Sequence, residues 1–106
     1  MSPSRPTMKE LDALIEDVTV DAYNDSEQLT AFETAFDEIA NFPCQGTVIG
    51  EDVEVLSLAV DDDRGELVAT CRRAGRRYKV ALQEIDLRSD PGTLRLFAAY
   101  RRWLSP

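Results

Sequence analysis

Three consecutive aspartates in the middle of the chain, Asp61, Asp62 and Asp63, are the residues best suited to binding chemistry. A glycine and a glutamate follow within the run 61–66, so the loop can offer side-chain and carbonyl oxygens together. Calcium takes ~6–8 such oxygens at about 2.3–2.6 Å and tolerates irregular geometry. The spacing is not that of an EF-hand, which needs a glutamate at the twelfth loop position, where this chain has Arg72. A solvated acidic turn is the alternative interpretation.

A second group of aspartates lies nearer the N-terminus, at Asp17, Asp21 and Asp25. The segment 18–23 is rich in β-branched residues and predicts a short strand. Alternate side chains of a strand point to the same side, so the three aspartates are expected to share one side if the chain stays extended. Asp21 is the strongest of the three because apolar residues flank it. The alternatives are that Asp25 only assists a helix start and that Asp17 is only solvated.

The run 72–79 is basic, with five positive charges and one aromatic residue, Tyr78, on a predicted hairpin. Such a surface could dock an acidic protein partner or the phosphates of a nucleic acid. Nucleic acid is disfavoured because the formal net charge of −8 repels a polyanion. The hairpin register also points Tyr78 inward, away from any base. Pairing of these charges with the chain's own acidic side chains is the alternative.

The residues do not favour catalysis, so the chain is expected not to be an enzyme. It has no histidine, which is the usual general base near pH 7. It also has no GxSxG, GxxxxGK[ST] or GxGxxG motif. Cys44 and Cys71 are neither CxxC-spaced nor flanked by other metal ligands. They are therefore expected to be small buried thiols rather than a disulfide or a zinc site.

Apolar spacing and capping residues predict three helices that would position these side chains. The first covers 7–16 and opens on Thr7, the second opens on Asn24 and ends before Pro43, and the third covers 90–104. Their apolar stripes are Met8, Leu11, Leu14 and Ile15, then Leu29, Phe32, Phe36 and Ile39, then Leu94, Phe97, Tyr100 and Leu104.

The middle of the chain predicts four strands, at 45–49, 53–60, 66–73 and 76–82. A two-residue loop at Ala74-Gly75 fixes the register of the last hairpin. Its pairs are Arg73 with Arg76, Cys71 with Tyr78, Ala69 with Val80, and Leu67 with Leu82. The last three pairs form the expected core face. Together the elements predict an α+β fold, a small, strongly bent antiparallel sheet of the SH3-like barrel type flanked by helices.

The length of 106 residues fits one domain, expected over 7–106 after a disordered tail at 1–6. Charge is unevenly distributed: residues 1–66 hold 17 acidic and 3 basic residues, and residues 67–106 hold 3 acidic and 9 basic. This asymmetry indicates two faces with different partners. No apolar run approaches the ~20 residues that span a bilayer, and the start shows no signal-peptide stretch. A cytoplasmic protein without a membrane partner is expected.

Several short motifs occur in a distinctive order. In the N-terminal half they are V-D-A-Y at 20–23, E-Q at 27–28, F-D-E at 36–38 and F-P at 42–43. In the C-terminal half they are E-D-V-E-V-L at 51–56, D-D-D at 61–63 and Y-K-V-A-L-Q-E-I at 78–85. Over about residues 18–104 this order resembles a family of small prokaryotic calcium-binding proteins without EF-hands, the CcbP-like family.

The resemblance implies that the chain binds Ca²⁺ at an all-oxygen site, as a cytoplasmic calcium buffer or sensor. Carboxylates would be the ligands, completed by backbone carbonyls and water. The expected ligands, in order of preference, are Asp61, Asp62 and Asp63, then Asp21, Asp37 and Glu38.

Overall fold

The helices begin at the residues whose side chains can cap them. In the computed structural model, which describes residues 6–105, the helices are α1 (Met8–Val18), α2 (Asp25–Ile39) and α3 (Pro91–Leu104). The side chains of Thr7, Asn24 and Asp90 each accept a hydrogen bond from the backbone N–H three residues later, at 3.1, 2.8 and 3.0 Å. The three predicted helices are confirmed. Residues 1–5 of the expected tail lie outside the described residues.

The predicted strand at 18–23 is wrong, because α1 continues through Val18. Thr19 closes the helix, since its backbone N–H and its hydroxyl both donate to the carbonyl of Ile15, at 3.0 and 2.7 Å. The chain then turns towards α2, leaving Val20 72% exposed. β-branched residues favour a strand only where a pleated, half-buried surface receives them. Within residues 6–105 no strand pairs with this segment.

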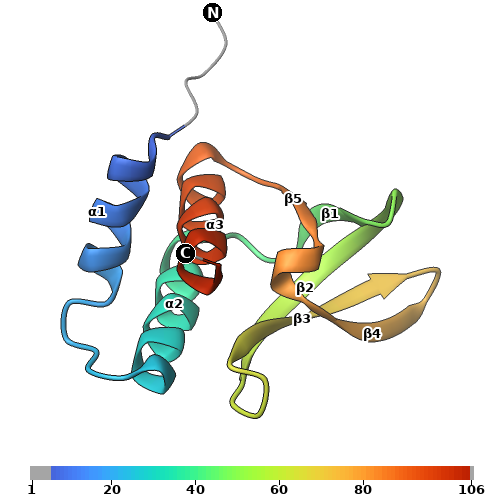
Figure 1. Ribbon diagram of the computed structural model, residues 1–106. Coiled ribbons are helices and arrows are strands. Elements are labelled where there is room, and N and C mark those ends of the chain that lie inside the picture. The colour runs from blue at the N-terminus through green and yellow to red at the C-terminus, as the bar shows by residue number, and fades with distance from the viewer. Residues whose placement is uncertain (1–5, 106) are drawn as a thin grey trace, which may run out of the picture.

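Five strands form one antiparallel sheet on the side of the molecule away from α1 (Figure 1). They are β1 (Cys44–Val48), β2 (Glu51–Asp61), β3 (Glu66–Arg73), β4 (Arg76–Ala81) and β5 (Asp86–Arg88), with a 3₁₀ helix, η1 (Leu82–Glu84), between the last two. The order across the sheet is β4-β3-β2-β1-β5. The α+β class is confirmed. The SH3-like barrel is not, because β4 and β5 remain open edges in the described part of the chain.

The register predicted for the β3–β4 hairpin is confirmed at three pairs, Arg73 with Arg76, Cys71 with Tyr78, and Ala69 with Val80. The fourth pair, Leu67 with Leu82, does not form, because the chain leaves β4 after Ala81 and turns into η1. Both leucines are nevertheless buried. Tyr78 shares the face of Cys71 as predicted, but it is not buried there, since it is 39% exposed on the edge strand.

Because of a β-bulge at Leu56, β2 contributes side chains to two parts of the core. The pairing of β2 with β3 shifts at this residue. Before the bulge, Val53 and Val55 are buried, and after it Leu58 and Val60 pack against the core instead. A bulge adds one residue and increases the local twist. The bulge, which the apolar pattern did not reveal, changes which side chains of β2 face the core.

The larger core cluster joins the helices to one end of the sheet. Phe32 and Phe36 of α2 meet Tyr100 of α3 edge-on, with ring centroids 5.6 and 6.3 Å apart. The buried hydroxyl of Tyr100 accepts a 2.7 Å hydrogen bond from the N–H of Leu67. This bond fastens α3 to the start of β3. The smaller cluster lies within the sheet and consists of Val53, Val55, Ala69, Cys71 and Ile85.

Both cysteines are free and belong to the sheet. Cys44 on β1 and Cys71 on β3 each lie opposite Val55 of β2. Two strand spacings therefore separate them, about 10 Å, whereas a disulfide needs Cα atoms within ~7 Å. Burial raises the pKa of both thiols. The expectation of small buried thiols holds for Cys71, whereas Cys44 is half-buried.

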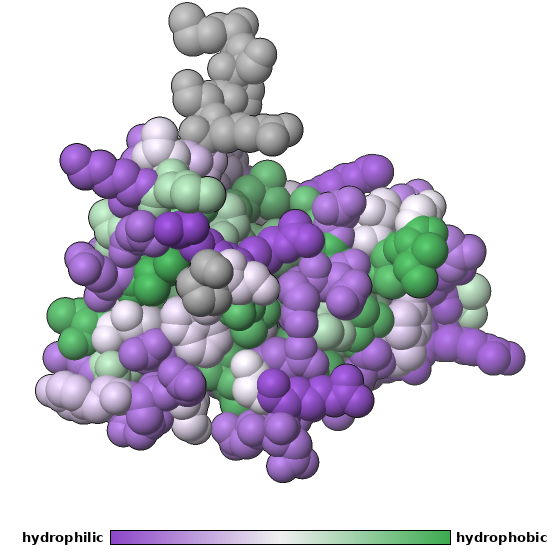
Figure 2. All heavy atoms as spheres, viewed as in Figure 1, coloured by the Kyte–Doolittle hydropathy of each residue, from purple (hydrophilic) through white to green (hydrophobic). Residues whose placement is uncertain are grey.

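The face of the molecule in Figure 2 is mostly hydrophilic, with hydrophobic side chains in scattered patches. The large hydrophobic side chains that are exposed are spread over several elements and loops: Met8, Val20, Tyr23, Ile39, Ile49, Tyr78 and Leu94. Leu94 was expected in the inner stripe of α3, but Leu96 and Ala99 are buried there instead. Among residues 6–105, no helix is both long enough and apolar enough to span a membrane.

Candidate functional site

The acidic loop predicted to hold an ion connects β2 to β3 and folds back on its own backbone. The carbonyl oxygen of Asp61 accepts a 2.9 Å hydrogen bond from the N–H of Gly65, and its carboxylate oxygen Oδ1 accepts one at 3.3 Å from the N–H of Arg64. Gly65 has φ +65°, a left-handed conformation that glycine adopts without strain. The turn thus places three consecutive carboxylates on a short, tight connection.

Asp62 links this loop to the helical layer. Its Oδ1 accepts a 3.3 Å hydrogen bond from the hydroxyl of Ser26, which lies in the first turn of α2 and 36 residues away in sequence. Asp62 and Asp63 are exposed, whereas Asp61 is half-buried. The loop therefore offers one half-buried carboxylate, one exposed carboxylate that contacts α2, and one exposed carboxylate at Asp63.

A hollow of about 400 Å³ lies beside the loop, on the outer face of the sheet. Its lining consists of Ala59, Val60, Asp61, Asp62, Asp63, Val68, Thr70 and Lys79. The three carboxylates and the hydroxyl of Thr70 are oxygen donors of the kind that calcium prefers. Lys79 brings a positive charge to the same hollow. Arg64 is turned aside, with its guanidinium 3.9 Å from the carboxylate of Glu66.

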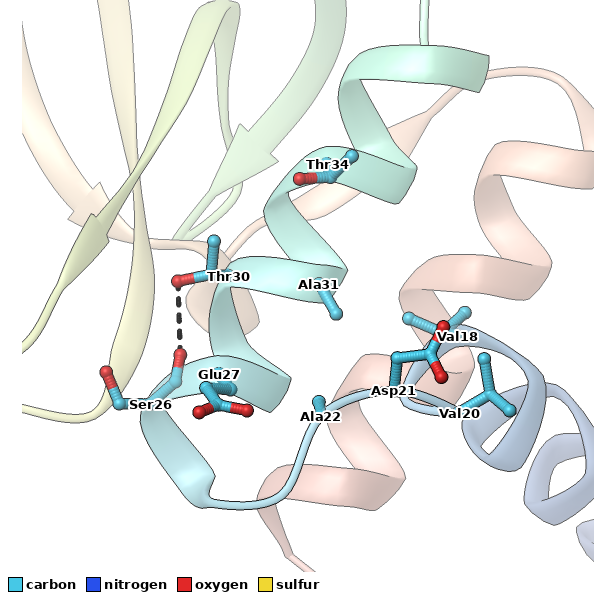
Figure 3. Close-up of a pocket in the computed structure, with 9 residues that line it drawn as sticks. All are labelled: Val18, Val20, Asp21, Ala22, Ser26, Glu27, Thr30, Ala31 and Thr34. Atoms are coloured by element: carbon cyan, nitrogen blue, oxygen red, sulfur yellow. Dashed lines mark hydrogen bonds between the residues drawn. The ribbon is translucent and has the colours of Figure 1, made fainter.

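Asp21 lies elsewhere, in the turn after α1. It lines a separate hollow of about 450 Å³ beside α2, together with Glu27 (Figure 3). The two carboxylates lie on opposite sides of Ala22 in this view. Glu27 is already engaged, because its Oε2 accepts a 2.9 Å hydrogen bond from the N–H of Tyr23 and its Oε1 one at 3.3 Å from the side-chain amide of Asn24. Asp21 is therefore a separate, single carboxylate.

Asp37 and Glu38 lie near the other end of α2. Asp37 is eleven residues beyond Ser26, which an α-helix converts to about 16 Å along its axis. Glu38 lines a third hollow, of about 410 Å³, together with Asp17. The six expected ligands thus occupy three places, and only Asp61, Asp62 and Asp63 line a hollow in common.

The described residues do not form a ready-made metal cage. Within residues 6–105, no group of three or more Asp, Glu or Cys side chains is gathered so that it could hold one ion. The donor chemistry at the loop fits calcium, since carboxylate, hydroxyl and carbonyl oxygens are all present. Closure around an ion would require Asp62 and Asp63 to rotate towards Asp61. Both side chains are exposed, so this motion meets little steric resistance.

The sequence did not identify three residues near the loop. The contact of Ser26 with Asp62 joins segments 36 residues apart, and no local pattern indicates it. Thr70 and Lys79 could have been found from the sequence, because the hairpin register places them opposite each other on the outer face. What the register did not reveal is that the acidic loop turns towards that face.

Comparisons with known proteins agree with this picture. A family model described as calcium binding, that of CcbP, matches residues 12–104. No curated protein matches the chain. Among solved structures, the crystal structure of Anabaena CcbP has a TM-score of 0.78 at 24% identity, covering 99% of this chain and 96% of that one. A calcium-binding protein in its calcium-binding form also has a TM-score of 0.78, at 22% identity, covering 98% and 96%.

These structural matches show that the fold is shared. The family match covers nearly all of the folded region, from within α1 to the end of α3. The chain therefore belongs to the calcium-binding CcbP family.

Proposed function

We propose that the protein is a cytoplasmic calcium buffer whose principal site is the loop at Asp61, Asp62 and Asp63. The observation behind this proposal is that Asp61, Asp62 and Asp63 line one hollow together with Thr70. A solved structural neighbour is described as being in its calcium-binding form, which supports the same ligand for this fold.

Buffering fits the geometry better than sensing. A sensor needs an element with two populated states that calcium favours unequally. Five of the six candidate carboxylates here are exposed and Asp61 is half-buried, and Asp21 and Glu38 line hollows other than the one beside the loop. We assign these outlying residues to weaker secondary binding. A protein that binds calcium ions at several exposed sites acts as a buffer. Such binding requires no catalytic group.

The experiment is calorimetric titration of calcium into the chelator-treated protein. We expect heat of binding in the intact protein and its loss in the triple variant Asp61→Asn, Asp62→Asn, Asp63→Asn. The matched control, Glu16→Gln, Glu84→Gln, Asp86→Asn, removes three exposed acidic charges elsewhere and should keep the heat. Calcium should also raise the melting temperature of the intact protein, because a ligand of the native state stabilises it.

Two results would remove the proposal. One is the absence of both heat and a thermal shift at millimolar calcium in the intact protein. The other is equal binding by the loop variant and the control, which would move the principal site away from the loop.

The basic hairpin supports a second function, the attachment of an acidic partner protein. Arg72 is paired with Glu54, and Arg73 with Glu51, so two of its five charges are used within the fold. The other three, on Arg76, Arg77 and Lys79, form no ion pair within residues 6–105. We expect binding through these residues to weaken with salt.

A further inference from the structure

Strand β4 is an edge of the sheet with one side unpaired in the described part of the chain. It lies far from the three helices in Figure 1, and its residues from Arg76 to Lys79 are exposed. An edge strand presents a row of free backbone N–H and C=O groups to which a further strand can bond. The opposite edge, β5, has only three residues and is followed almost at once by Pro91, so it offers a poor template.

The hairpin loop determines which residues of β4 face outward. Ala74 and Gly75 have φ values of 52° and 77°, as a two-residue type I′ turn requires. Such a turn closes on a hydrogen-bonded pair, here Arg73 and Arg76. Bonded and non-bonded pairs then alternate along an antiparallel ladder. The backbone groups of every second residue after Arg76, beginning with Arg77, therefore point away from β3.

These outward positions are Arg77, Lys79 and Ala81, and two of the three carry a positive side chain. The basic side chains lie on the outer face of the sheet, and neither forms an ion pair within residues 6–105. Backbone bonding groups and unpaired positive charge thus coincide at the same two residues. A second copy of β4 would bring like charges together, which is destabilising. A strand with acidic side chains would bring opposite charges together.

We propose that β4 accepts an extended acidic segment of a partner protein as a sixth strand of the sheet. The segment would bond to the backbone of Arg77 and Lys79 and place Asp or Glu side chains, two residues apart, opposite them. The hydrophilic character of the face in Figure 2 agrees with recognition by charge and backbone rather than by an apolar patch. This inference rests on the partner-binding function of the hairpin and is independent of calcium binding.

The test uses a fluorescein-labelled ten-residue peptide in which glutamate alternates with valine, titrated with the intact protein and followed by anisotropy. A second peptide of the same sequence, methylated at the backbone nitrogen of every glutamate, keeps the charge but loses the N–H donors that would face Arg77 and Lys79. A single-stranded oligonucleotide of equal charge serves as the third probe. We expect the unmethylated peptide to bind and the other two to bind at least about tenfold more weakly, since charge alone is shared by all three.

Two variants and one backbone measurement complete the experiment. The variant Arg77→Glu, Lys79→Glu should lose peptide binding, whereas Lys9→Glu, Arg95→Glu, with the same change in net charge, should retain it. Amide hydrogen exchange should slow at Arg77 and Lys79 when the unmethylated peptide is added, because their N–H groups become bonded. Exchange at Tyr78, whose N–H already faces β3, should change little.

The outcomes separate strand addition from simple charge attraction. Equal binding of the unmethylated and N-methylated peptides, or unchanged exchange at Arg77 and Lys79, overturns strand addition but leaves the hairpin as an electrostatic docking surface. Preference for the oligonucleotide assigns the surface to nucleic acid and overturns the proposal. No binding of any probe at low salt overturns both strand addition and the partner-binding function.

Discussion

The two ends of β3 differ in how their charges are satisfied. At its start, the loop with Asp61, Asp62 and Asp63 lies against α2, and the contacts of these carboxylates are with Ser26 and with the loop's own backbone. At its end, Arg72 and Arg73 are held by glutamates on β2. The acidic charges at the start of β3 are therefore available for binding, whereas two of the basic charges at its end are already paired within the fold.

This difference shows why counting charges along a sequence is a weak guide to function. Five positive charges predicted a strong basic surface at 72–79, but cross-strand pairing leaves only Arg76, Arg77 and Lys79 free within residues 6–105. Three acidic charges at 61–63 were equally compatible with a solvated turn. Their position in a hollow with Thr70 makes them the better binding site.

The largest effect is expected where the acidic end of β3 is fastened to the helices. The variant Tyr100→Phe leaves the buried N–H of Leu67 without its partner, which should cost about 1–3 kcal/mol of unfolding free energy. Urea denaturation measures this loss. The control Tyr23→Phe, at an 87% exposed residue, should stay within about 0.5 kcal/mol of the parent. Equal stability of the two variants would show that the bond does not anchor the sheet.

The same tyrosine gives stability a pH dependence in the alkaline range. Burial raises the pKa of Tyr100 from 10.0 to about 12. In the unfolded chain the phenol ionises first, so the stability is fully present below pH 10 and is lost as the pH rises from 10 towards 12. The variant Tyr100→Phe should remove this part of the alkaline slope in melting temperature, and an unchanged slope would contradict the assignment.

A smaller effect should appear where the two charged regions meet. Lys79 extends from the basic hairpin into the hollow beside the acidic loop, so its charge opposes a cation there. The variant Lys79→Gln should raise calcium affinity about two- to fivefold at low salt. Arg77→Gln, which lacks a place in that hollow, is the matched control. If calorimetry gives equal calcium affinities for the two variants, the charge of Lys79 does not influence the calcium site.

The smallest effect is expected at the paired arginines. Arg72 is partly exposed, and solvent screens its pairing with Glu54. The variant Arg72→Ala should therefore lower the unfolding free energy by less than about 1 kcal/mol. Urea denaturation of Arg72→Ala and of Tyr100→Phe compares the unfolding free energy that each end of β3 contributes. A loss at Arg72 as large as that at Tyr100 would mean that the basic end also holds the fold together.

Sequence predicted best the features that local chemistry determines. The caps at Thr7, Asn24 and Asp90 fixed the helix starts, and the two-residue loop after Arg73 fixed the hairpin register. The failures have non-local causes. The segment 18–23 has the composition of a strand but no strand to pair with, and the three-residue β5 is too short for any periodicity.

The candidate site was predictable in residue type but not in arrangement. Three adjacent aspartates at 61–63 indicated oxygen ligands, and the structure keeps them together beside one hollow. The separation of Asp21 from Asp37 and Glu38 depends on how α1 and α2 pack, which no single segment encodes. The contact between Ser26 and Asp62 depends on the same packing.

The most direct test of calcium binding at the loop is a calcium titration followed residue by residue in amide NMR spectra of the chelator-treated protein. We expect the first and largest shifts at residues 61–66, with smaller ones at Ser26 and Thr70 and almost none at the hairpin loop of Ala74 and Gly75. Shifts confined to α2 around Asp37 and Glu38, or no shift at millimolar calcium, would contradict a principal site at this loop.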